Sequence, residues 1–186
     1  MSAASVDGTI RTERLNLVAL ALPVMEALVA GDAAEASRLA GISVPADWPA
    51  KAGGFLPIFR DRLAANPAAQ PWLFRAMVLS RPPERPMVGH IGFHFPPDEH
   101  GMVELGYTVF PEYRRAGYAT EAVRALMDWA AGQPGVTRFR ASVSPTNEPS
   151  LAVIGKLGFS QTGSQWDEED GEELVFERLR PRGGGP

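Results

Sequence analysis

The sequence predicts a mixed α/β domain, and three observations support this fold class. The 186 residues are 45% hydrophobic and 22% charged, which is typical of a globular protein and not of a disordered chain. Several short segments of β-favouring apolar residues are separated by turn residues, as expected for strands. Between two of these segments the apolar residues change to a helical spacing, so strands and helices alternate in the later part of the chain.

The first third of the chain combines one strand with helices. Residues 12–20 (TERLNLVAL) have the apolar, β-favouring character of a first strand. Residues 20–40 are rich in Ala, Leu and Glu and predict one or two short helices, interrupted near Gly31-Asp32. The Pro and Gly content of 44–54 predicts a loop, and 55–67 predict a helix that ends before the proline.

The middle of the chain predicts three consecutive strands. The segments 72–80 and 87–95 are separated by the turn RPPERP, and the turn DEHG at 98–101 leads into a strand over 102–110. A helical stripe of apolar residues then predicts a helix packed against the sheet. The stripe consists of Ala119, Ala122, Val123, Leu126 and Ala130.

The last part predicts the closing elements of the sheet. Residues 138–144 form a strand, and Asn147-Glu148-Pro149-Ser150 opens a helix that Gly158 ends. The segments 159–166 and 173–179 flank an acidic turn and predict a hairpin. A solvated turn explains these acidic residues more simply than a binding site for a cationic acceptor.

The order of the elements also predicts the domain organisation. A helix joins the strands 102–110 and 138–144, so these two strands are expected to be parallel, with a right-handed crossover. No repeat or linker interrupts the chain, so residues 10–180 are predicted to form a single domain. Residues 1–9 are expected to be a flexible leader, and 181–186 a flexible tail.

Composition excludes several classes of function. A net charge of -4 argues against a nucleic-acid partner, and the absence of cysteine excludes disulfides, thiolate metal sites and a cysteine nucleophile. No apolar run approaches the roughly 20 residues of a membrane span, so we expect a cytoplasmic protein without a membrane partner. His90 and His94 would lie about 13 Å apart on one strand, too far to share an ion, so no metal is expected. Trp48, Phe55 and Phe59 are expected in the core rather than in an acceptor pocket.

The turn between the 102–110 strand and the next helix suits an anionic ligand. The first turn of a helix has unpaired N–H groups and the positive end of the helix dipole. Gly117 allows close approach to the backbone, small Ala119 keeps the path clear, and Arg114 and Arg115 add charge-assisted contacts to phosphate. Local chemistry alone leaves open an ordinary strand-to-helix turn with a solvated basic pair.

Two motifs resemble those of a known enzyme superfamily. Arg114-x-x-Gly117-x-Ala119 resembles the loop that binds the acyl-CoA pyrophosphate in the GNAT superfamily of N-acetyltransferases. Residues 147–159 (NEPSLAVIGKLGF) resemble the helix that closes the CoA site in these enzymes. The start TERLNL and the segment PADWP are similar to the Rim-type branch, which acetylates the N-termini of ribosomal proteins. The resemblance covers about residues 10–180, with specific motifs in 103–130 and 147–159.

The resemblance implies a fold and a donor site. The fold is a mostly antiparallel sheet of about seven strands flanked by helices, in which the parallel pair 102–110 and 138–144 splays apart around the CoA site. Acetyl-CoA is then the acyl donor, and its pantetheine arm pairs with backbone groups near Thr108 and Val109. The residues expected to bind it are Thr108, Val109, Arg114, Arg115, Ala116, Gly117, Tyr118, Ala119, Thr120 and Asn147.

The resemblance also implies catalytic residues. An amine is mostly protonated near neutral pH, so a base must remove a proton before attack on the thioester. Glu104, on one strand face with Gly106 and Thr108, matches the glutamate that related enzymes use, although it could also be a surface carboxylate in an ion pair. Ser150 is the candidate acid for the CoA thiolate, with Tyr107, Tyr113 or water as alternatives. Asn147 is expected both to cap its helix and to face pantetheine.

The implied function is acetyl transfer from acetyl-CoA to a primary amine by direct attack. The acceptor is expected to be a peptide N-terminus or a small amine, and the Rim-type similarity favours the N-terminus. Two alternatives are a non-catalytic module that binds or senses acyl-CoA on the same fold and an ordinary phosphate-binding domain. The presence of Glu104, Asn147 and Ser150 favours the enzyme. The oligomeric state stays open, a homodimer included.

Overall fold

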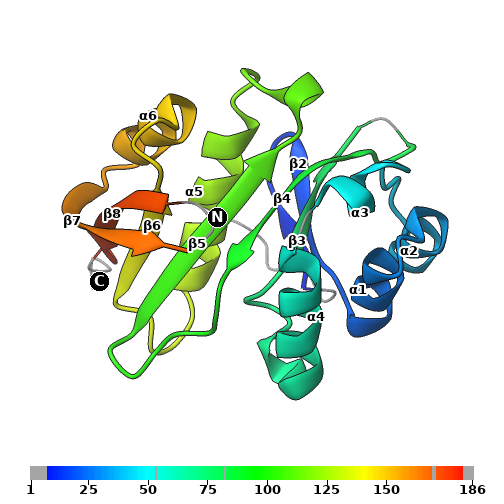
Figure 1. Ribbon diagram of the computed structural model, residues 1–186, viewed down its shortest axis with the longest axis horizontal. Helices are drawn as coiled ribbons and strands as arrows, with labels where there is room; N and C mark the ends of the chain where they lie inside the picture. The colour runs from blue at the N-terminus through cyan, green and yellow to red at the C-terminus, as the bar shows by residue number, and fades with distance from the viewer. Residues whose placement is uncertain (1–7, 53, 82, 169–170, 182–186) are drawn as a thin grey trace.

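The computed structural model describes residues 8–52, 54–81, 83–168 and 171–181, and an eight-stranded sheet runs through it (Figure 1). The strand order is β1-β2-β3-β4-β5-β6-β8-β7. The strands are β1 (Ile10–Arg11), β2 (Leu15–Ala19), β3 (Arg75–Leu79), β4 (Met87–Phe93), β5 (Met102–Val109), β6 (Arg138–Val143), β7 (Ser160–Asp167) and β8 (Gly171–Leu179). The mixed α/β class is therefore confirmed, with β1 added to the strands expected.

The pairing of β5 with β6 opens the sheet at its centre. These two strands run parallel, whereas the other neighbouring strands of the sheet pair antiparallel. The parallel pairing joins Met102–Glu104 to Arg138–Arg140 and goes no further. Beyond Glu104 the carboxyl halves of β5 and β6 diverge, which confirms the expected splayed pair.

Helices cover both faces of this sheet. They are α1 (Leu22–Val29), α2 (Ala33–Ala40), α3 (Trp48–Lys51), α4 (Phe55–Ala65), α5 (Tyr118–Ala131) and α6 (Glu148–Lys156), with the short 3-10 helices η1 (Pro67–Ala69) and η2 (Pro111–Tyr113). In Figure 1, α1 and α2 lie towards the β2–β4 end, and α6 lies near β6–β8. One core packs α5 and α6 against the sheet, and a second packs α1–α4 against it. Met77 of β3 belongs to the first core and its neighbours Ala76 and Val78 to the second, because successive side chains of a strand point to opposite faces.

The segment 44–54, expected to be a loop, contains the short helix α3. Its Trp48 is buried, with ring centroids 6.0 Å from Phe74 and 5.7 Å from both His90 and Phe110. Packing of this aromatic side chain holds a helical turn that the Pro and Gly content did not predict, because tertiary contacts override local propensity. The expectation that Trp48 belongs to the core is confirmed.

The first described residues, 8–10, pack against the rest of the domain. Ile10 of β1 pairs with Leu17 of β2, and both side chains are buried. Gly8 and Thr9 were expected in the leader, yet the Gly8 carbonyl accepts a hydrogen bond of 2.7 Å from the buried Arg75, and Thr9 is buried. Residues 1–7 and 182–186, the remainder of the expected leader and most of the tail, lie outside the described residues. None of the described helices has the length and apolar character that a bilayer span requires.

Candidate functional site

A cavity of about 710 Å³ lies where β5 ends and helices α5 and α6 begin. It brings together the two motif segments, which are far apart in the sequence. Every residue expected to bind the donor lines this cavity except Ala116. These lining residues are Thr108, Val109, Arg114, Arg115, Gly117, Tyr118, Ala119, Thr120 and Asn147.

The turn before α5 has the backbone geometry of an anion site. Gly117 is the N-cap residue, and its φ of 83° lies in the left-handed region that favours glycine. Arg115 is also left-handed, with φ of 61°, so the chain folds into a tight concave turn. No side chain caps this helix end, which leaves the N–H groups of its first turn able to bond a ligand. The Nε of Arg114 donates to the Val109 carbonyl at 3.0 Å, which holds the turn against the end of β5.

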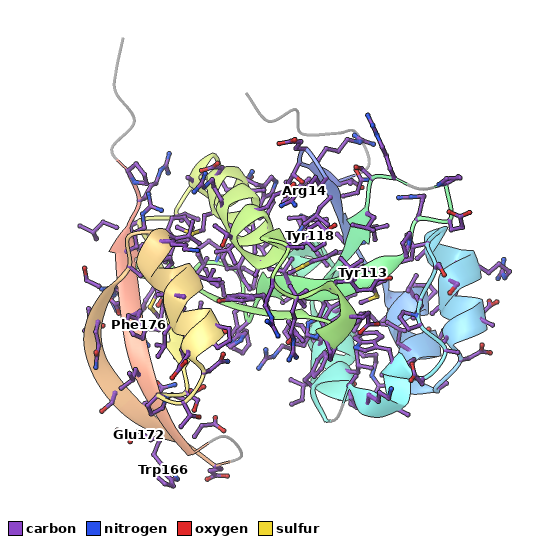
Figure 2. All side chains as sticks on the ribbon, turned by 90° about the horizontal axis from the view of Figure 1, so that it is seen from above. Arg14, Tyr113, Tyr118, Trp166, Glu172 and Phe176 are labelled. Atoms are coloured by element: carbon purple, nitrogen blue, oxygen red, sulfur yellow. The ribbon has the colours of Figure 1, made fainter. Side chains whose placement is uncertain are left out.

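Arg14, which no motif had singled out, supports this turn from outside the cavity. Its Nη1 donates to the Ala116 carbonyl at 2.8 Å, and its Nε donates to Glu121 Oε2 at 2.7 Å. Its guanidinium lies over the Tyr118 ring, 4.7 Å from the centroid. Arg14 and Tyr118 are labelled close together at the start of α5 in Figure 2. Ala116 therefore contributes a carbonyl to the support of the turn. The signal in the sequence was the TERLNL segment, which contains Arg14.

The start of α6 forms the opposite wall. The Asn147 side chain accepts a hydrogen bond of 3.2 Å from the Ser150 N–H, so the expected N-cap is present. A smaller cavity of about 320 Å³ lies between the diverging strands and also reaches Glu173. Tyr107, Asn147 and Ser150 line both cavities, so the two spaces adjoin at the gap in the sheet.

Backbone N–H and C=O groups of β5 are directed alternately towards β4 and towards the gap between β5 and β6. The Glu104 carbonyl accepts from the His94 N–H at 2.8 Å, on the β4 side of the strand. Because backbone direction alternates along a strand, Thr108 also bonds towards β4, whereas Tyr107 and Val109 turn their backbone groups to the gap. The exposed side chain of Thr108 reaches the cavity, and the backbone suited to pair with a ligand is that of Tyr107 and Val109.

Glu104 lies at the base of the gap, where β5 and β6 separate. Its Oε1 accepts a hydrogen bond of 2.6 Å from Ser142 Oγ. Gln165 Nε2 in turn donates to Ser142 Oγ at 3.2 Å and to Glu173 Oε2 at 3.0 Å. The Glu104 carboxylate is thus held by a hydroxyl on the face of the sheet away from α5 and α6.

Two further residues line the larger cavity: Tyr107, which was an alternative to Ser150 as the acid, and Lys156, which had not been predicted as a site residue. The Tyr107 hydroxyl lies 3.5 Å from the Ser150 carbonyl, and burial raises the pKa of Tyr107, so it keeps its proton in neutral solution. It can therefore serve as a proton donor beside Ser150.

Lys156, at the last turn of α6, adds an exposed cation to the wall of the larger cavity. The signal in the sequence was its position within the motif of residues 147–159.

The two strand histidines have different environments. The His90 ring lies among Trp48, Phe55 and Phe74, and burial lowers the pKa of His90 to about 4. The His94 ring lies over Gly106 on the neighbouring strand. Within the described ranges, no three acidic or histidine side chains gather in a way that could hold a metal ion.

Comparisons with known proteins agree with this geometry. The family described as the acetyltransferase (GNAT) domain matches residues 14–160. An uncharacterized N-acetyltransferase of Bacillus subtilis, YjdG, is 31% identical over 152 residues, which are 81% of this chain and 88% of that protein.

Solved structures share the fold. The microcin C7 self-immunity acetyltransferase MccE, in complex with acetyl-CoA and AMP, superposes with a TM-score of 0.62 at 17% identity, over 90% of this chain and 93% of that one. RimL, a ribosomal L7/L12 α-N-protein acetyltransferase in complex with coenzyme A, superposes with a TM-score of 0.60 at 18% identity, over 90% and 95%. At these identities the likeness concerns the fold.

Proposed function

The chain belongs to the GNAT family of acetyltransferases, and from this we propose that it transfers the acetyl group of acetyl-CoA to a primary amine by direct attack. The observation that carries the proposal is the cavity that joins the uncapped N-terminus of α5 to the gap between β5 and β6. An elongated donor with an anionic end and a neutral arm fits such a site. The acceptor class we favour is a protein N-terminal α-amine or a small-molecule amine.

The lining residues suit each part of acetyl-CoA. The turn with Gly117 and the cations of Arg114, Arg115 and Lys156 suit its phosphates. The backbone of Tyr107 and Val109 faces the gap and suits the amide groups of pantetheine. MccE and RimL, which share the fold, hold acetyl-CoA and coenzyme A respectively, which supports the assignment of the donor.

The proposed reaction forms an N–C bond and breaks a C–S bond. The amine nitrogen attacks the thioester carbonyl, and the CoA thiolate leaves and takes up a proton. Glu104 is the proposed base, because it is the last residue of β5 paired with β6 and its carboxylate accepts a hydrogen bond from Ser142, which lines the smaller cavity. Tyr107 and Ser150, which line both cavities, are the proposed sources of the proton for the thiolate.

An unbiased acceptor screen tests the proposal. The protein is incubated with acetyl-CoA and either N-terminal peptides or small amines, including aminoglycosides, while CoA release is followed. Mass spectrometry then locates the acetyl group. Acetylated α-amines or small amines support the proposal. Acetylation confined to lysine side chains or hydroxyls contradicts the acceptor class, and tight acetyl-CoA binding without transfer to any acceptor indicates a non-catalytic acyl-CoA-binding module.

A further inference from the structure

His94 lies on the face of the sheet that carries Glu104. It directly follows β4, and its N–H bonds the Glu104 carbonyl at 2.8 Å, so the two residues are opposite each other on neighbouring strands. Opposite residues of an antiparallel pair project to the same face. The imidazole of His94 and the carboxylate of Glu104 therefore share one side of the gap.

Gly106 makes room for this imidazole. The His94 Nε2 lies 3.0 Å from the point that a Cβ of residue 106 would occupy, so a side chain there would displace the ring. Gly106 also lines the smaller cavity between the diverging strands. The ring of His94 thus lies over a residue that lines this cavity, through which the acceptor reaches the thioester in the proposed function.

The charged groups around His94 come from three elements. Glu104 of β5 and Glu173 of β8 are the carboxylates that act on it, and Arg62 of α4 is the cation. Arg62 is held in place by a hydrogen bond of 2.9 Å from its Nη1 to the His94 carbonyl and by the Phe95 ring, 3.9 Å away. Burial lowers the pKa of His94, as does Arg62, against the opposing effect of the two carboxylates. The imidazole is consequently neutral near pH 7 and able to accept a proton.

The chemistry of the proposed function removes two protons from the acceptor nitrogen. An ammonium group carries three protons on nitrogen and the amide product carries one, so two protons leave the nitrogen in each turnover. One of them is matched by the proton that the CoA thiolate takes up, and the other is released to water. With two adjacent proton acceptors, the site can take up both protons in one turnover. Neither acceptor then has to lose its first proton before the second one leaves the nitrogen.

We propose that His94 is a second proton acceptor of this enzyme, taking the proton from the incoming ammonium ion while Glu104 takes the proton lost as the N–C bond forms. The inference rests on the proposed function. In the first step the N–H bond of the ammonium breaks and Nε2 gains the proton, giving a neutral amine and an imidazolium beside Glu104. The carboxylate stabilises that imidazolium, and the proton then passes to water.

Steady-state kinetics of His94→Gln test the proposal, with the best acceptor from the screen. We expect kcat/KM at pH 7 to fall by about 10-fold, less than the roughly 10²-fold or more typical of a lost general base, because Glu104 remains. The deficit should shrink as pH rises and the amine deprotonates in solution. His100→Gln is the matched control, because His100 is exposed in a turn, and it should keep wild-type activity.

Three further measurements separate proton transfer from a structural role. Added imidazole should restore activity to His94→Ala, and acetyl-CoA affinity should stay unchanged in both His94 variants. In NMR titrations, where the chain has three histidines to assign, Glu104→Gln should lower the pKa of His94. Wild-type rates in His94→Gln, or a loss that is equal at every pH and not rescued by imidazole, would overturn the proposal. Failure of the wild-type protein to release CoA with any amine would instead refute the proposed function.

Discussion

The carboxylate of Glu121, in the first turn of α5, holds Arg14 at both its backbone and its guanidinium. Glu121 Oε1 accepts from the Arg14 N–H at 2.9 Å, and Oε2 lies 2.7 Å from both Nε and Nη2. The same guanidinium bonds the Ala116 carbonyl, so the hairpin at the start of the sheet is tied to the turn before α5. Arg14 and Tyr118 lie side by side at this helix end in Figure 2.

Disrupting the ion pair between Arg14 and Glu121 should weaken binding of acetyl-CoA. Arg14→Ala removes charge-assisted hydrogen bonds that hold the turn, so we expect the acetyl-CoA Kd to rise by about 10-fold. Glu121→Gln should have a similar effect, and the double variant should be little worse than either one, because both act through one contact. Calorimetry measures all three. Arg38→Ala breaks the exposed pair with Glu35, far from the turn, and should leave Kd unchanged. Strictly additive losses would argue against a shared role.

Gly117→Asp should abolish acetyl-CoA binding while the fold survives. Asp tolerates the left-handed conformation better than most residues, and its Cβ would sit 3.4 Å from Arg14 Nη2, an acceptable approach to a flexible side chain. The new negative charge would face the donor phosphates at the helix end. Calorimetry and thermal unfolding check the two halves of this expectation. Gly163→Asp, on the exposed edge strand β7, is the control for added charge. Unchanged affinity would mean that the donor binds elsewhere.

Lys156 should contribute to donor affinity through its charge. Replacing it with Met keeps the apolar stem, and we expect acetyl-CoA Kd to rise about 3- to 10-fold at low salt, a loss of roughly 1 kcal/mol. The difference should diminish as salt screens the attraction. Arg124→Met, an exposed cation of α5 that does not line the cavity, serves as the comparison. A salt-independent loss would indicate a packing role instead.

Glu104→Gln should lower turnover with little change in donor affinity. If the carboxylate accepts a proton in the reaction, kcat should fall by about 10²-fold near pH 7. The amide oxygen can still accept the Ser142 hydrogen bond, so the local structure is retained. The deficit should shrink at higher pH, where free amine is abundant. Glu112→Gln changes an exposed carboxylate of η2 and should behave as wild type. Wild-type turnover of Glu104→Gln across the pH range would reduce Glu104 to a structural role.

His90 should make the protein sensitive to mild acid. Burial lowers its pKa to about 4, whereas in the unfolded chain it titrates near about 6.5, so below that pH the unfolded state binds a proton that the native state does not. Stability therefore falls as pH decreases, by about 2 kcal/mol between pH 7 and pH 4.5. Urea unfolding at several pH values measures this slope. His90→Phe keeps an aromatic ring at this buried position. The variant should show a weaker dependence of the unfolding free energy on pH, because the contribution of His90 is gone. An unchanged slope would show that the carboxylates alone account for acid unfolding.

Much of the fold, and the two segments that line the candidate donor site, could be predicted because the signals are local. The turn from Arg114 to Ala119 and the helix from Asn147 are contiguous in sequence, and their roles depend on backbone conformations that Gly and Asn favour over short distances. The parallel pairing of β5 and β6 followed from one helical connection, and their splaying from the resemblance to the GNAT superfamily. The short helix α3 was not predicted, because it depends on the burial of Trp48 among residues from other elements.

The sequence by itself determined the class of fold, the order of the elements and the segments that build the cavity, since hydrophobic periodicity and capping act over a few residues. Only the tertiary structure decided that Arg14 supports a turn about a hundred positions away, and that His94 lies over Gly106 beside Glu104. Both relationships depend on which strands pair and in what register. Register is set by the burial of whole strand faces against two cores, and no local pattern in the chain specifies which distant side chains then meet.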